Sequence, residues 1–102
     1  MKELLNNLNV GDKLYKTSKG TYYLFRKKSL DGGISYSINK AQKTLPLETI
    51  NKAVNDKNLN NIEKRGVLRT WYKDYNPREL TNNPCNVSVL KNLILKRVPL
   101  KK

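Results

Sequence analysis

Alternating apolar and polar positions between residues 13 and 38 predict strands. Residues 21–28 are rich in aromatic and β-favouring side chains, and residues 34–38 alternate apolar and polar without a break. Ser-Lys-Gly at 18–20 and Asp-Gly-Gly at 31–33 separate these runs, because glycine supplies the positive φ that tight turns need. We therefore predict a three-stranded antiparallel β-meander over about 13–38, with one face buried.

From residue 45 onward the hydrophobic spacing becomes helical. Leu47, Ile50, Ala53 and Val54 form an apolar stripe, and Pro46 stands near the helix start, where its missing N–H costs little. Comparable stripes follow further along the chain. Three short helices are expected, over about 46–55, 62–75 and 86–97.

Capping and breaking residues refine these boundaries. Thr44 and Asn86 are the expected caps of the first and third helices. Gly66 either weakens the middle of the second helix or marks its true start. Pro77 ends that helix, because the residue before a proline avoids the helical region.

The order of these elements predicts an α+β fold in a single small domain of 102 residues. A short N-terminal helix over 2–8 precedes the meander, the helical part covers 45–98, and a basic tail occupies 99–102. Helices covering one face of the meander would give it the support that a lone three-stranded sheet lacks.

Charge changes the picture more than any motif does. The chain has 21 Lys and Arg against 8 Asp and Glu, a formal net charge of +13. Six basic residues and no acidic one lie between Lys13 and Leu30, and no acid follows Glu79. This distribution is typical of a protein that follows a phosphate backbone.

The basic residues expected to contact phosphates lie on the meander and on the second predicted helix. On that helix, positions 65, 69 and 73 are four residues apart and predict one basic ridge. An ordinary solvated helix face, and a strand end protected from aggregation by lysines, remain the alternatives. The candidates are Lys16, Lys19, Arg26, Lys27, Lys28, Arg65, Arg69 and Lys73.

Aromatic side chains alternate with these cations. Alternation along the second strand puts Tyr22 on one face and Tyr23 on the other, so one set meets the helices and the other is partly exposed. Tyr22 and Tyr36 are the candidates for stacking on unpaired bases, with ordinary core and surface positions as the alternative. Trp71 is expected in the core.

The remaining chemistry is limited. The chain has no histidine, and its acidic residues are scattered, so no metal site and no cofactor is expected. The single cysteine, Cys85, cannot form an internal disulfide, which indicates a reducing, cytoplasmic setting. No apolar run reaches the roughly 18 residues of a membrane span, so no membrane partner is expected.

These observations predict a small intracellular nucleic-acid-binding protein rather than an enzyme. DNA is favoured over RNA, because a basic hairpin with a basic helix suits duplex grooves. Two alternatives stay open. One is a protein that binds an acidic protein partner through an apolar patch, and the other is a toxin-like ribonuclease that uses Arg, Lys and Tyr in place of histidine. The patch would comprise Leu93, Leu95, Val98 and Leu100.

Overall fold

Four strands form one antiparallel sheet in the computed structural model, which describes residues 8–16, 20–29, 32–38 and 40–95. The strands lie side by side in chain order. The α+β class is confirmed, and the predicted meander forms the first three strands. The strands are β1 Lys13–Lys16, β2 Tyr22–Lys28, β3 Ile34–Ile38 and β4 Ala41–Leu45.

The fourth strand was not predicted. Its sequence, Ala-Gln-Lys-Thr-Leu, lacks the apolar alternation of a half-buried strand, and only Leu45 in it is buried. The strand forms because its backbone pairs with β3 along its whole length, as far as Ala41 opposite Ile38. Thr44, the expected helix cap, lies within this strand. The residue at the cap position is Pro46, whose ring offers no side-chain acceptor.

Four helices are described where three were expected between residues 46 and 97. Gly66 has a left-handed φ of 88°, so the second expected helix begins at Val67 rather than at residue 62. Gly66 therefore marks its true start. The helices are α2 Leu47–Asn55, α3 Val67–Tyr75, α4 Pro77–Asn82 and α5 Asn86–Ile94.

The additional helix, α4, comes from a proline with two roles. Pro77 ends α3 and occupies the first turn of α4, where a backbone N–H would have no partner within the helix, so its absence in proline costs little. The side chain of Asn76 caps α4 by accepting a hydrogen bond from the backbone N–H of Glu79, at 3.0 Å. The cap prediction for Asn86 was wrong, because Cys85 occupies that position and Asn86 is the first residue of α5. That helix ends at Ile94 rather than at residue 97.

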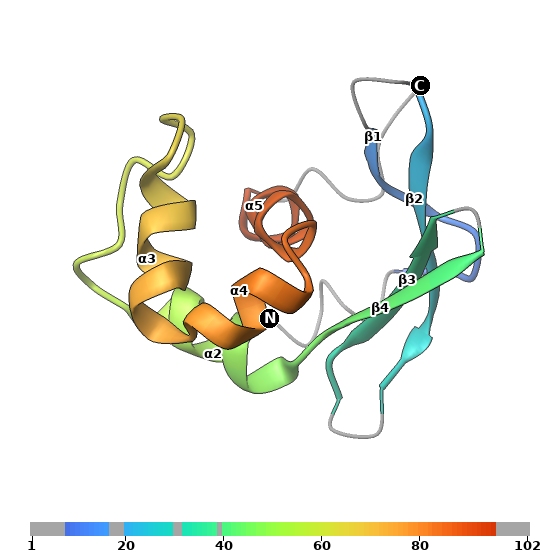
Figure 1. Cartoon of the computed structure of the whole chain (residues 1–102), viewed down its shortest axis with the longest axis horizontal. Helices are drawn as coiled ribbons and strands as arrows, with labels where there is room; N and C mark the ends of the chain where they lie inside the picture. The colour runs from blue at the N-terminus through green and yellow to red at the C-terminus, as the bar shows by residue number, and fades with distance from the viewer. Residues whose placement is uncertain (1–7, 17–19, 30–31, 39, 96–102) are drawn as a thin grey trace.

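The helices all lie on one side of the sheet, so the described chain forms two layers (Figure 1). Helix α5 contacts β1 and β4 directly, whereas α3 lies on the far side of α5 from the sheet (Figure 1). The core fills the space between these layers. Its largest buried side chains include Tyr23, Phe25, Tyr36, Ile50, Leu68, Tyr72, Leu90 and Leu93.

Two expected segments fall largely or wholly outside the described residues. Of the predicted helix over 2–8, only Leu8 is described, and it is buried. The tail at 99–102 lies beyond the last described residue. Among the helices that the structure describes, none has the length and apolar character needed to cross a membrane.

Candidate nucleic-acid interface

The sheet has one face packed on the helices and one face that no described helix covers (Figure 1). Burial alternates along β2, where Tyr23 and Phe25 are buried and Tyr22 and Leu24 are only half-buried. The strand therefore directs Tyr22 and Leu24 away from the helices. This settles which face of the meander is inward.

Strand register identifies the other residues on this uncovered face. Leu24 lies opposite Lys13 on one side and Ser37 on the other, and directly opposed residues share a face. Pairing of Ser37 with Gln42 continues the row to β4. A second row crosses the sheet through Lys27, Ser35 and Thr44. We call this surface the open face, and it comprises Lys13, Tyr22, Leu24, Lys27, Ser37, Gln42 and Thr44; Ser35 lies in the same row but is buried.

The Tyr22 ring on the open face contacts the ammonium of Lys13. The Nζ atom of Lys13 lies 4.5 Å from the centroid of the Tyr22 ring. Such a contact is attractive because the ring face carries partial negative charge. Tyr22, one of the two tyrosines expected to stack on bases, is thus positioned beside a positive charge on the face that no described helix covers.

A β-bulge shapes the other end of β2. Phe25 pairs with Tyr36 and Lys27 pairs with Ser35, so Arg26 is an extra residue that pairs with no residue of β3. Arg26 and Lys27 are both exposed, and the structure gives neither an ion pair with a described residue. The bulge therefore presents two consecutive cations to solvent.

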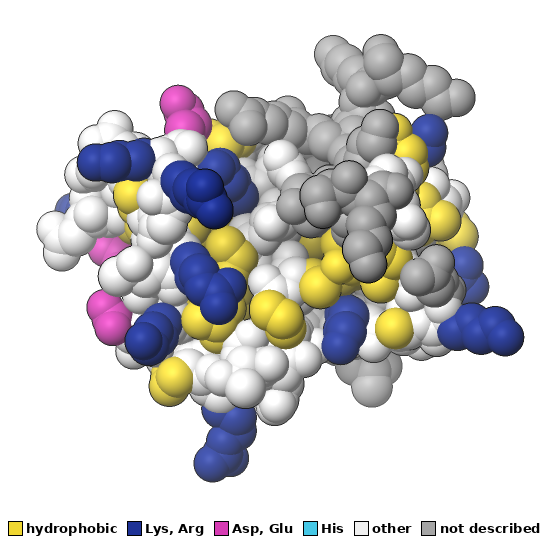
Figure 2. Space-filling view, turned by 45° about the horizontal axis from the view of Figure 1, so that its top comes forward, with side chains coloured by type: hydrophobic (Ala, Val, Ile, Leu, Met, Phe, Trp, Pro, Cys, Tyr) yellow, Lys and Arg dark blue, Asp and Glu magenta, His cyan; other side chains and the backbone are white. Residues whose placement is uncertain are grey.

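Charge is distributed unevenly between the two layers. Residues 13–45, which build the sheet, contain eight Lys and Arg and one acid, Asp31. Residues 46–95, which build the helices, contain eight Lys and Arg and five acids. Figure 2 shows acidic side chains over the helices at the left, and none among the described residues visible over the sheet at the right. The sheet layer thus carries the larger excess of positive charge.

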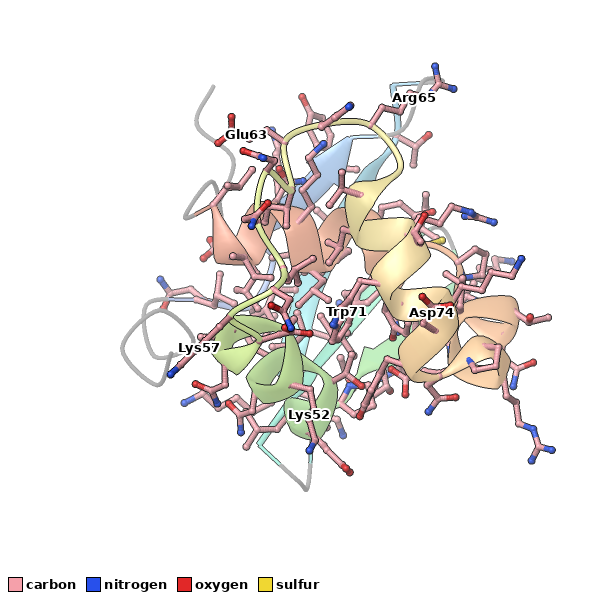
Figure 3. The ribbon with its side chains drawn as sticks, turned by 90° about the vertical axis from the view of Figure 1, so that its left-hand side faces the viewer. Lys52, Lys57, Glu63, Arg65, Trp71 and Asp74 are labelled. Atoms are coloured by element: carbon pink, nitrogen blue, oxygen red, sulfur yellow. The ribbon has the colours of Figure 1, made fainter. Side chains whose placement is uncertain are left out.

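The predicted basic ridge on α3 is shorter than expected. Arg65 precedes the left-handed Gly66 and lies in the loop before the helix, so only Arg69 and Lys73 remain on it. Figure 3 shows Arg65 at the end of α3 remote from Asp74, which lies beside Lys73 in sequence. All three predicted cations are exposed. They do not form one continuous row.

The other predicted phosphate ligands are divided between described and undescribed positions. Lys28 is exposed at the end of β2, opposite Ile34. Lys16 lies in β1, opposite Tyr22 in the register. Lys19 lies outside the described residues.

Tyr36 cannot stack on a base, because its side chain is fully buried between the sheet and the helices. Its hydroxyl donates a hydrogen bond to Oδ1 of Asn86, which is also fully buried. Burial raises the pKa of Tyr36 far above its ordinary value, so the hydroxyl stays a neutral donor. The alternation that placed Tyr36 on a strand could not distinguish its two faces.

Asn86 lies at the centre of a polar network that joins the two layers. Its Nδ2 atom donates to the main-chain oxygen of Thr44 at 3.0 Å and to the hydroxyl of Tyr72 at 3.1 Å. The Tyr72 hydroxyl in turn donates to Oε1 of Glu79, which also accepts from the hydroxyl of Thr49 at 2.8 Å. Burial, followed by the bond to Glu79, raises the pKa of Tyr72. Sequence analysis missed this network, because its members are distant along the chain.

Trp71 is half-buried rather than in the core. Its indole N–H donates to Oδ2 of Asp56 at 2.9 Å, and its ring stacks on Tyr75 with centroids 5.1 Å apart. Figure 3 shows Trp71 between α2 and α3, on the side of the molecule away from the sheet. These contacts give Trp71 a role in joining α3 to the end of α2.

The residues expected to support other functions are placed differently from the prediction. Leu93 is fully buried, so the predicted apolar patch with Leu95 does not form as expected; its other two members lie outside the described residues. The Cys85 sulfur lies 2.7 Å from the hydroxyl of Tyr23, on the inner side of the sheet. Within the described residues, no three Cys, Asp or Glu side chains gather to form a metal site.

No protein-family model, no curated protein and no solved structure matches this chain. The arrangement of its own residues is therefore the basis for a functional proposal.

Proposed function

We propose that this protein binds nucleic acid, with DNA as the first ligand to test, through the open face of its sheet and the adjoining bulge. The observation that carries the proposal is the charge of the segment 13–45, from which all four strands come, with eight basic residues against one acidic residue. A polyanion relieves the repulsion among such charges, and its binding releases condensed counterions.

The bulge supplies the central phosphate contacts. Arg26 and Lys27 are exposed, adjacent and without an ion pair among the described residues, so neither must leave a partner to reach a phosphate. Lys13 adds a cation on the same face. The α3 cations Arg69 and Lys73 make a second, separate surface, because α5 and the core lie between α3 and the sheet (Figure 1).

The proposal is tested by binding measurements on charge-matched variants. The sheet variant is Arg26→Gln/Lys27→Gln. Its control, called the α2 variant, is Lys52→Gln/Lys57→Gln, with Lys52 on α2 and Lys57 just beyond the end of that helix. Each removes two positive charges from exposed positions, and the control residues lie on the helical side of the molecule (Figure 3). Fluorescence anisotropy with labelled DNA, measured across a range of salt concentrations, gives the affinity and its salt dependence.

We expect the sheet variant to bind more weakly than the α2 variant at every salt concentration. For each phosphate of duplex DNA that a variant fails to neutralise, the slope of log affinity against log salt should become shallower by about 0.9. Equal weakening in the two variants would show that only total charge matters and would refute the assignment to the sheet. Absence of binding to any nucleic acid at physiological salt would refute the function itself.

A further inference from the structure

The open face has a chemical pattern beyond its charge. Tyr22 and Leu24 project from the same side of β2 and lie about 7 Å apart along the strand. Arg26 and Lys27 follow this pair along β2, and Lys13 lies beside it on β1, opposite Leu24, with its ammonium over the Tyr22 ring. Apolar and aromatic surface thus has positive charge beside it and beyond one of its ends.

We propose that the open face binds a single, unpaired nucleic-acid strand lying along β2, with a base stacked on Tyr22. This inference rests on the proposed function and specifies its substrate. Every base has a π-face, but a base in a duplex uses both of its faces to stack on its neighbours. Only an unpaired strand can offer a face to Tyr22 while its phosphates lie beside Lys13 and Lys27.

The shallow shape of the open face favours binding of an unpaired strand over binding of a duplex. The neighbouring positions on β3 and β4 are Ser37, Gln42 and Thr44, of which two are short hydroxyl side chains. Tyr22 and Leu24 are themselves half-buried, so they do not stand out far from the sheet. A shallow surface of this kind suits flat stacking, whereas reading a duplex requires an element that enters a groove.

The positions of the cations also argue against a single duplex-binding site that combines the sheet cations with those of α3. The open face is directed away from the helices, and α3 lies beyond α5 on the opposite side (Figure 1). Arg26 and Arg69 therefore belong to different sides of the molecule.

Lys13 has a defined part in this site. Its ammonium lies over one face of the Tyr22 ring, 4.5 Å from the centroid. A base that stacks on this face would displace the ammonium, which would then contact the adjoining phosphate.

The test compares a labelled oligothymidylate of about 12 nucleotides with the duplex that it forms with its complement. Tyr22→Leu removes the ring and keeps apolar bulk, and Tyr22→Phe keeps the ring and removes the hydroxyl. Tyr75→Leu is the matched control, because Tyr75 is also half-buried but lies on α3. Circular dichroism and thermal melting establish that each variant is folded before its affinity is measured.

We expect the single strand to bind more tightly than the duplex. Tyr22→Leu should weaken single-strand binding by about 5- to 150-fold, the range found for base–aromatic stacking. Tyr22→Phe and Tyr75→Leu should stay within about twofold of the wild type, and duplex affinity should not respond to Tyr22→Leu. If the leucine variant is unfolded, Tyr22→Thr, which favours strands and also lacks a ring, must show the same weakening.

The possible failures are distinguishable. Duplex binding as tight as single-strand binding, or a Tyr22→Leu variant with wild-type affinity, would refute the unpaired-strand inference. The proposed function would survive that result if the sheet variant still bound nucleic acid more weakly than the α2 variant. Failure of both single strand and duplex to bind would overturn both.

Discussion

Replacement of Tyr36 by phenylalanine tests whether the polar network fastens the helices to the sheet. The change removes one hydroxyl and keeps the ring that fills the core. In the described residues, that hydroxyl is the only donor to Oδ1 of Asn86, and both side chains are fully buried. A buried acceptor that loses its partner costs about 1–3 kcal/mol. For a chain of this size, such a destabilisation lowers the melting temperature by roughly 4 to 24 °C.

Urea unfolding followed by circular dichroism measures the change in the free energy of unfolding. Tyr75→Phe is the matched control, because the structure gives the Tyr75 hydroxyl no hydrogen bond to a described residue. We expect the control to change stability by less than about 0.5 kcal/mol. Equal effects of the two substitutions would show that the Tyr36 hydroxyl contributes nothing beyond its ring, and the network would lose its proposed role.

Three further predictions concern other parts of the fold. Gly33→Ala should lower the melting temperature strongly, because the added Cβ would lie 2.3 Å from the main-chain oxygen of Leu45. A variant that melts at the wild-type temperature would contradict that close approach. The carboxylate of Asp56 accepts hydrogen bonds from the backbone N–H of Asn58 and from the Trp71 indole, and these bonds, the first being the larger cause, lower its pKa in the folded state. The stability that Asp56 contributes is therefore present above its unfolded-state pKa and is lost as the pH falls through its lower folded-state pKa. The stability advantage of the wild type over Asp56→Asn, measured by urea unfolding, should therefore shrink below about pH 4, and a constant difference would refute this linkage. In low salt, the sheet variant should melt at a higher temperature than the α2 variant, because like charges repel by about 0.4 kcal/mol at 10 Å in water; the opposite order would contradict the charge asymmetry.

Local sequence patterns were sufficient to predict the strands and helices that have a clear hydrophobic pattern of their own. The aromatic and β-favouring run over 21–28 predicted β2, alternation over 34–38 predicted β3, and the stripe from Leu47 predicted α2. By contrast, β4 has no such pattern of its own, and its extended backbone is stabilised by pairing with β3. The helix α4 was missed because Pro77 was interpreted only as the end of a helix, although proline equally favours a first turn.

Some features of the candidate site could likewise be predicted from the sequence and others could not. The excess charge of the sheet could be counted from the sequence, and so could the run from Arg26 to Lys28. The direction of each side chain could not, because alternation defines two faces without saying which one meets the helices. Tyr22 and Tyr36 were therefore equal candidates in the sequence, and only the packing of the helices separates the half-buried ring of Tyr22 from the fully buried ring of Tyr36.

The inner network and the open face are two sides of the same strands. Asn86 bonds to Tyr36 on β3 and to the main chain of Thr44 on β4, so the helices hold both strands from the inner side. The outer side is then not required for cohesion and can carry mutually repelling cations such as Arg26 and Lys27. Those charges destabilise the free protein slightly, and a bound polyanion removes that cost. Because a ligand that binds only the folded state also stabilises it, nucleic-acid affinity and the rise in melting temperature on binding should weaken together in the sheet variant.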